Sequence, residues 1–188
     1  MNRMQLQKQR THEQILAAAG QLFRATGYRN TGIDQLMHSL GLAVGGFYNH
    51  FDSKEALFRE VVDSTVSEAV ESIASDDVSP EDYRRNVTNR YLSAEHRDNP
   101  AVGCILPCLS AEVARANDDV RSAYTRFVTR IVGRMAEKLP DDDQLSSDER
   151  AWSLMAMAVG GLMLSRAVDD EELSQRILAA CREACDHL

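Results

Sequence analysis

The sequence predicts an all-α fold of about nine helices. Only four of the 188 residues are proline, and no segment keeps up the apolar–polar alternation typical of a strand. Apolar residues recur instead at helical spacing, and glycines such as Gly27 and Gly41 stand where that spacing ends. A chain of this length can bury a core of its own.

Cap and turn residues divide the first part of the chain into four helices. The first is expected from about Thr11, as N-cap, to Thr26, with Gly27 as its stop. The second opens at 31–32 and ends at Gly41, where glycine enters the left-handed region without steric cost. A short third helix is expected over 43–50. A long fourth helix follows the cap Ser53 and reaches the acidic loop at 75–80.

The rest of the chain predicts five further helices. Their expected ranges are about 80–95, 103–116, 118–138, 147–167 and 171–187. Two domains are expected, 9–69 and 70–188, and their boundary lies inside the fourth helix rather than in a linker. The two domains should therefore be mechanically joined.

Residues 32–51 have the pattern of a helix-turn-helix. Ile33, Leu36 and Met37 form the apolar side of its first helix, and Phe47 and Phe51 form the apolar side of the second. A helix that short depends on its neighbours for stability, and its free side is polar. These properties suit insertion into a DNA major groove.

The charge distribution is compatible with one end on DNA. The whole chain has a formal charge of −8, yet residues 1–60 hold seven Lys and Arg against five Asp and Glu, a balance of +2. The remaining residues therefore hold −10. This asymmetry indicates an acidic body held away from phosphate.

The N-terminal third resembles the TetR family of bacterial transcriptional repressors. The resemblance rests on the spacing from Ile15 to Phe23, on Gly27-Tyr28, on Thr31 to Gly41, and on Phe47-Tyr48-x-x-Phe51 before SKEAL. It implies a homodimer on double-stranded operator DNA, with a C-terminal half that binds a small-molecule effector. The DNA-contacting residues that it implies are Thr31, Gln35, Ala43, Val44, Gly45, Gly46, Tyr48, Asn49, His50 and Lys54.

Within that set, the resemblance assigns different roles. Tyr48 and Lys54 would bind phosphates, with Asn49 or His50 near the same backbone. Residues 43–46 would face the groove floor but offer no side-chain donor to base edges, where family members often have Ser or Thr. Recognition of the base sequence could come from Val44 against thymine methyl groups, from Gln35, or from the N-terminal Arg3, Lys8 and Arg10.

The acidic half predicts a dimer interface and a cavity. The last two predicted helices are apolar over much of their surface, so a partner subunit should cover one face. Mixed apolar and polar side chains could line an effector cavity, although an ordinary core explains each of them equally well. The candidates are Tyr91, His96, Cys104, Cys108, Tyr124, Phe127, Met135, Trp152 and Met155.

The four cysteines leave an alternative open. They form two C-x3-C pairs, Cys104/Cys108 and Cys181/Cys185, which most simply are small buried residues. A helical thiol-based redox protein, or a redox-sensing regulator using Cys104 and Cys108, is the rival hypothesis. The spacing is not the C-x-x-C redox motif, and a metal site with His96 is weaker still. A third reading is a helical adaptor without DNA contacts.

Other classes are not expected. The sequence has no nucleotide-binding loop, zinc-protease helix or nucleophile elbow, so we expect no enzyme activity, cofactor or metal. The longest apolar run, about 155–164, is too short to span a bilayer, and the N-terminus lacks a secretory signal. We expect a cytoplasmic, ligand-responsive DNA-binding regulator, most simply a repressor.

Overall fold

The computed structural model describes residues 2–74, 78–142 and 144–188, and within these ranges all regular structure is helical. The all-α prediction is therefore confirmed. The elements are α1 (Arg3–Thr26), α2 (Ile33–Ser39), η1 (Val44–Asn49), α3 (Lys54–Ala74), α4 (Pro80–Tyr91), α5 (Ala94–Asp98), η2 (Pro100–Val102), α6 (Ile105–Val113), α7 (Asp118–Ala136), α8 (Ser147–Ala167) and α9 (Glu171–Asp186), where η denotes a 3-10 helix.

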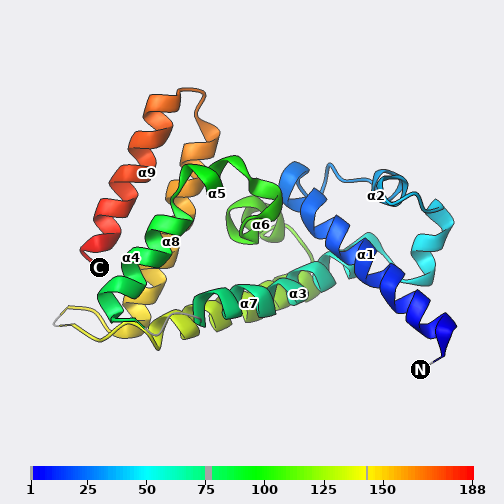
Figure 1. The fold of residues 1–188 in the computed structure, drawn as a ribbon, viewed down its shortest axis with the longest axis horizontal. Coiled ribbons are helices and arrows are strands. Elements are labelled where there is room, and N and C mark those ends of the chain that lie inside the picture. Colours follow the sequence, from blue (N-terminus) through cyan, green and yellow to red (C-terminus); the bar gives the residue numbers. More distant parts are fainter. Residues whose placement is uncertain (1, 75–77, 143) are drawn as a thin grey trace.

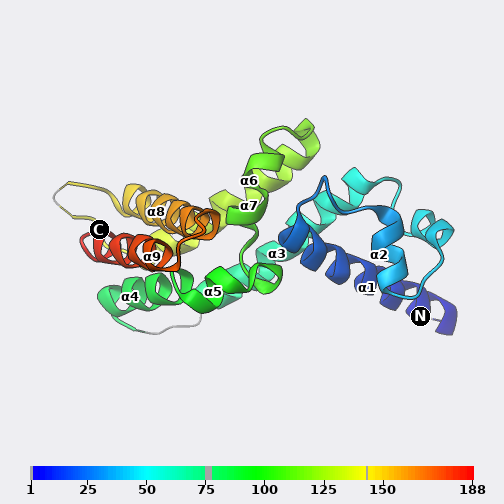
Figure 2. The same cartoon turned by 90° about the horizontal axis from the view of Figure 1, so that it is seen from above.

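The helices form an elongated molecule with two ends. Figure 1 shows α1, α2 and η1 together at one end, which we call the head, and α4, α8 and α9 at the other, which we call the body. Helices α3 and α7 run side by side along the long axis and join the two. Figure 2 shows α8 and α9 packed together at the body end. Helix α3 therefore links the two ends through one continuous helix.

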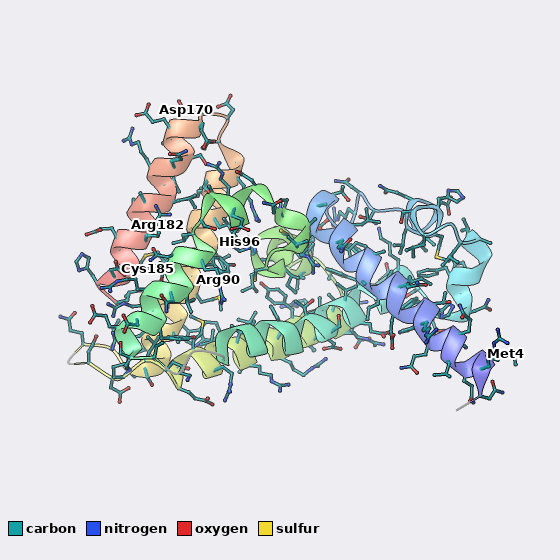
Figure 3. All side chains as sticks on the ribbon, in the orientation of Figure 1. Met4, Arg90, His96, Asp170, Arg182 and Cys185 are labelled. Atoms are coloured by element: carbon teal, nitrogen blue, oxygen red, sulfur yellow. The ribbon has the colours of Figure 1, made fainter. Side chains whose placement is uncertain are left out.

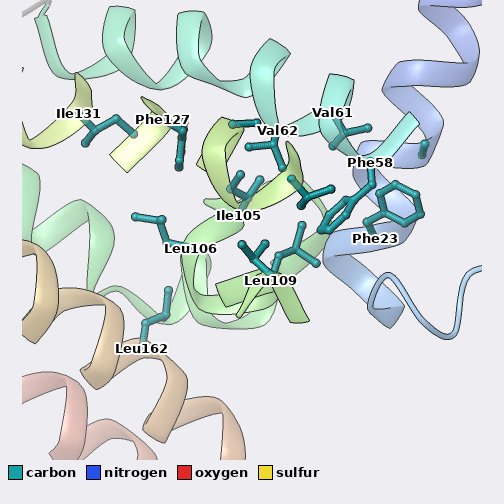
Figure 4. Packing of buried hydrophobic residues seen from close by; sticks show 14 of the residues in the cluster. Phe23, Phe58, Val61, Val62, Ile105, Leu106, Leu109, Phe127, Ile131 and Leu162 are labelled. Carbon is teal, nitrogen blue, oxygen red and sulfur yellow. The ribbon is translucent and has the colours of Figure 1, made fainter. Parts of the chain in front are cut away.

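A continuous apolar core fills the junction between head and body. Phe23 of α1 and Phe58 of α3 meet edge to face, with ring centroids 5.5 Å apart. Figure 4 shows Ile105 and Leu109 of α6 beside these rings, and all four side chains are fully buried. Helix α6 therefore packs into the head as well as the body.

The start of α1 differs from the prediction. The helix begins at Arg3 rather than Thr11, because Asn2 caps it: its Oδ1 accepts the Met4 amide at 2.7 Å, and Gln5 completes a capping box. Thr11 lies inside the helix, where its hydroxyl donates to the carbonyl of Gln7. The added turns are exposed and project beyond the rest of the head, with Met4 near their tip (Figure 3).

Most other boundaries follow the sequence signals. Gly27 and Gly41 have φ of +87° and +67°, as expected of helix stops. The hydroxyl of Ser53 accepts the amide of Ala56 at 3.0 Å, which confirms the predicted cap of α3. Helix α3 is continuous across the predicted domain boundary at 69/70, and the two-domain division itself stays a prediction.

Two local predictions were wrong. The predicted helix over 80–95 stops at Tyr91, where Leu92 leaves the helical region, and α5 begins after the new cap Ser93. The segment 43–50 forms the 3-10 helix η1 instead of an α-helix, with Ala43 as its N-cap. Two adjacent glycines in this six-residue segment weaken α-helical propagation.

One face of α8 is apolar and points away from the core. Exposed Trp152, Met163 and Leu164 lie on the helix side opposite the buried Leu154 and Leu162. Leu164 is 60% exposed and Trp152 is 42% exposed. Leu173, Ala180 and Ala184 form an exposed stripe on the neighbouring α9. Exposed apolar residues on two helices that pack together are typical of an interface.

The packing of α8 on α9 allows no side chain at Gly161. A Cβ there would lie 2.6 Å from Sγ and 2.9 Å from Cβ of Cys181, whereas one at Gly160 would meet nothing within 4 Å. We expect Gly161→Ala to lower the free energy of unfolding by about 1–3 kcal/mol through overpacking. Gly160→Ala, the matched control, should raise it by up to ~1 kcal/mol through helix propensity. Urea denaturation measures both, and equal effects would contradict the packing.

Candidate DNA-reading surface and effector cavity

The turn between α2 and η1 places polar side chains on the surface of the head. Phe47 is fully buried and Phe51 nearly so, which anchors η1 on the core. Between them Tyr48 is 61% exposed, with its ring edge to face against Phe47 at 5.2 Å. Asn49 is exposed as well. The prediction that Phe47 and Phe51 form the inner side and Tyr48 the outer side is confirmed.

Lys54 lies on an aromatic platform at the start of α3. Its Nζ is 4.3 Å from the centroid of the Tyr28 ring, and that ring stacks on Phe58 at 4.3 Å. The Tyr28 hydroxyl donates to Glu55 at 2.9 Å, and burial followed by this bond raises the pKa of Tyr28. Partial burial lowers the pKa of Lys54. The ammonium therefore sits on a fixed site beside the exposed end of α3.

A second group of polar side chains surrounds His50. Its Nδ1 is buried with no hydrogen-bond partner among the described residues, and burial, together with the charges of His12 and Lys8, lowers the pKa of His50. His12 stacks on Phe51 at 4.4 Å, and its Nε2 lies 2.5 Å from a carboxylate oxygen of Glu60. The first turns of α1 thus bring the cation Lys8 near the end of η1.

The other predicted DNA-contacting residues are distributed unevenly. Gln35, Ala43 and Gly45 are exposed, and Val44 and Gly46 are half-buried. For Thr31 the predicted phosphate contact was wrong. Its side chain is only 1% exposed, and its hydroxyl donates to the carbonyl of Gly27 at 2.9 Å and is also hydrogen-bonded to the hydroxyl of Thr26. Its side chain closes the turn after α1 and is not available to a phosphate.

A cavity of about 670 Å³ lies among α4, α5, α6, α7 and α8. A volume of this size accommodates a small organic molecule. Its apolar wall comes from Leu106, Ile131, Met135, Leu154 and Ala158, on α6, α7 and α8. Its polar wall comes from α4, the segment around α5, α1 and α3, and consists of Arg24, Thr65, Thr88, Arg90, Tyr91, Ser93, Glu95, His96 and Asn99. Figure 3 shows Arg90 and His96 on this side of the body.

Arg24 brings the head into the cavity wall. It lies in the last turn of α1, and its Nε donates to the carbonyl of Ala101 at 2.8 Å. Ala101 belongs to η2, directly before the cavity residues Val102 and Gly103. One side chain therefore contacts the cavity and belongs to the helix that supports the DNA-reading surface.

His96 is fixed as a neutral imidazole against the start of α6. Its Nδ1 lies 2.8 Å from the Tyr91 carbonyl and must donate, and its Nε2 accepts the Cys104 amide at 3.1 Å. Gly103 permits this approach, because a Cβ there would be 2.6 Å from Nε2. Burial is the largest cause that lowers the pKa of His96, and Arg166 and Arg90 add to it.

The thiols near the cavity are not activated. Burial raises the pKa of Cys104 and of Cys108, so both are protonated at neutral pH. Arg166 donates to the sulfur of Cys108 at 3.5 Å and lowers that pKa by less than burial raises it. All four cysteines are free.

The structure separates the predicted effector residues into two groups. Tyr91, His96, Cys104, Met135 and Met155 line the cavity. Cys108, Tyr124, Phe127 and Trp152 lie outside its wall, and for these four the prediction was wrong. The hydroxyl of Tyr124 is hydrogen-bonded to that of Ser110, Phe127 is buried in the apolar core, and Trp152 is exposed on α8.

Several residues of the cavity wall were not predicted from the sequence. Thr88 precedes Tyr91 by three positions and so shares its helix face, a signal that could have found it. Arg24 and Asn99 reach the cavity only through the fold, and the sequence carries no local sign of this. Within the described ranges no three His, Cys, Asp or Glu side chains could hold a metal ion, and no helix could cross a membrane.

Residues 15–61 match the sequence profile described as bacterial regulatory proteins, tetR family. The chain is 26% identical over 167 residues to an HTH-type transcriptional regulator in the lacX 3′ region of Lactococcus lactis, covering 85% of both chains. It is 26% identical over 133 residues to the HTH-type transcriptional repressor NemR of Escherichia coli K12, covering 69% of this chain and 67% of NemR. The reduced form of E. coli NemR superposes with a TM-score of 0.80 at 20% identity, covering 95% of this chain and 96% of NemR.

The lowered pKa of His96 has a consequence for stability. The imidazole of His96 binds a proton less readily in the folded protein than in the unfolded chain. Its contribution to the free energy of unfolding is therefore fully present above about pH 6.5 and is lost as the pH falls through the pKa of the folded state. We expect the His96→Gln variant to lose less stability than the unsubstituted protein between pH 7.5 and about pH 5. Urea denaturation at each pH measures this, with His38→Gln on exposed α2 as control. An NMR titration that placed His96 above about pH 6.5 would contradict the assignment.

Proposed function

Because this chain belongs to the tetR family of bacterial regulatory proteins, we propose that it is a homodimeric repressor released from its operator by a small molecule. One observation carries the proposal: Arg24 of α1 lines the 670 Å³ cavity, so ligand binding has a direct route to the head. The proposed function implies a cytoplasmic protein, since a bacterial repressor must reach its operator DNA in the cytoplasm.

The head supports DNA binding through phosphate contacts. Tyr48 offers an exposed hydroxyl donor, and Lys54 offers an ammonium beside the amides that open α3. Lys8 and the exposed Arg3 and Arg10 extend the positive surface along α1. Residues 43–46 provide backbone and the Val44 methyl groups to the groove floor, and Gln35 an exposed amide. Affinity should therefore depend strongly on salt.

The body supports a two-fold dimer through α8 and α9. Their exposed stripes are apolar, and a small residue such as Ala156 permits a close approach of helices. A dimer also places two heads on half-sites about one DNA turn, ~34–36 Å, apart. Trp152, rejected above as a cavity residue, fits this interface as a large aromatic anchor.

The effector should be a small, largely apolar molecule with a few polar groups. The apolar wall from α6, α7 and α8 would bury its body, and the polar side near α4 and α5 would orient it. An effector releases DNA only if it binds the released arrangement more tightly than the DNA-bound one.

The alternative, a redox-sensing regulator using Cys104 and Cys108, has one supporting observation, that Cys104 lines the cavity. The raised pKa of both thiols weakens it, because the protonated thiol is a poor nucleophile. Alanine at both positions with an unchanged effector response would exclude this alternative.

The operator itself tests the proposal. We expect selection from random duplex DNA to yield a preferred sequence, with Lys54→Gln and Tyr48→Phe each weakening its binding about tenfold. Only Lys54→Gln should also reduce the slope of log K against log salt, by about 0.9 per protomer. Arg130→Gln on exposed α7 is the charge-matched control. Absence of any sequence preference would refute the proposal.

The dimer interface predicts a second result. Leu164→Glu places a charge in the apolar stripe of α8, so the variant should sediment as a monomer and lose cooperative operator binding. Ala179→Glu, on an exposed side of α9 away from the stripe, should remain dimeric. Analytical ultracentrifugation distinguishes them, and a dimeric Leu164→Glu variant would place the interface elsewhere.

A further inference from the structure

The carboxylate of Glu112 joins α6 to the turn that leaves α1. Its Oε2 accepts the Tyr28 amide at 2.6 Å, and its Oε1 accepts the Arg29 amide at 2.9 Å. Both oxygens are used, and both donors are consecutive backbone groups far away in sequence. Charge-assisted hydrogen bonds of this length are among the stronger polar contacts in a protein.

The turn is shaped to receive this carboxylate. Gly27 has φ of +87°, and a Cβ there would lie 3.4 Å from Oε2 and 3.5 Å from Oε1 of Glu112. The positive φ of Gly27, which glycine adopts without steric cost, comes directly before the two amides that donate to this carboxylate. Gly27 therefore ends α1 and also leaves space for the carboxylate of Glu112.

The two ends of this contact lead to different parts of the molecule. On the head side, Tyr28 carries Lys54 on its ring and donates its hydroxyl to Glu55. On the body side, α6 begins at the cavity, where Cys104 is its N-cap and Leu106 lies in its first turn. The short helix α6 thus has the cavity at one end and the Glu112 carboxylate at the other.

We propose that Glu112 is a positioning residue that, beside Arg24, transmits occupancy of the cavity to the DNA-reading head. A ligand that displaces α6 moves both carboxylate oxygens away from two fixed amides, and the Tyr28 platform then loses its support. Lys54 shifts with Tyr28, so phosphate binding weakens. This inference rests on the proposed function and names a residue through which that function is regulated.

A double-mutant cycle on a selected operator tests the inference. Ala158→Phe fills the cavity from α8 and stands in for a ligand, so no effector needs to be known. We expect it to weaken operator binding at least about fivefold in the unsubstituted protein. In the Glu112→Gln background, which keeps one acceptor but turns an NH₂ toward the second amide, the same change should have at least about threefold less effect.

Hydrogen exchange supplies a second readout. The amides of Tyr28 and Arg29 should exchange faster in Glu112→Gln and also in Ala158→Phe, while the core of α8 remains protected. Glu183→Gln on exposed α9 is the matched control and should change neither quantity. If Glu112→Gln does not fold, Glu112→Asp keeps the charge with a shorter reach and should give an intermediate result.

The outcomes separate the two proposals. No sequence-preferring DNA binding by the unsubstituted protein would remove the proposed function and this inference with it. Normal binding combined with an equal effect of Ala158→Phe in both backgrounds would overturn the inference alone. Normal binding that Ala158→Phe leaves unchanged would overturn it as well, since the cavity would then have no influence on the head.

Discussion

The packing of α6 between head and body is the contact on which the rest of the structure depends. Ile105 and Leu109 are fully buried beside Phe23 and Phe58, so the apolar core has no break between head and body. Burial of aromatic and aliphatic side chains on this scale resists separation of the two ends. The polar contacts of Arg24 and Glu112 then fix the orientation of an interface that the apolar packing already holds together.

Helices α3 and α6 connect the head and the body in different ways. Helix α3 connects the ends covalently and without interruption, whereas α6 connects them through side chains alone. A continuous helix is stiff along its axis, but side-chain contacts can be remade in a second arrangement at small cost. Regulation by a ligand needs both properties, since the head must move as a unit and must have more than one stable position.

The sequence predicted those parts of the molecule that local signals determine. Gly27, Gly41 and Ser53 mark helix ends because their backbone or side-chain chemistry acts on adjacent residues, and the apolar spacing of 33–37 marks the inner face of α2. Three errors have different physical origins. Asn2 forms a better cap than Thr11, the paired glycines leave η1 too weak for an α-helix, and the turn after α1 buries Thr31. Cavity residues such as Arg24 depend on contacts between distant helices, which a single sequence does not reveal.

The length of α1 has a mechanical consequence. Its 24 residues form one unbroken helix of about 36 Å, with Arg24 at the cavity end and Met4 near the opposite tip. A tilt of about 5° at the cavity end would displace the far tip by about 3 Å, close to the spacing of successive base pairs. Helix α1, which supports the recognition segment, can therefore convert a small tilt at its cavity end into a loss of register along the DNA groove.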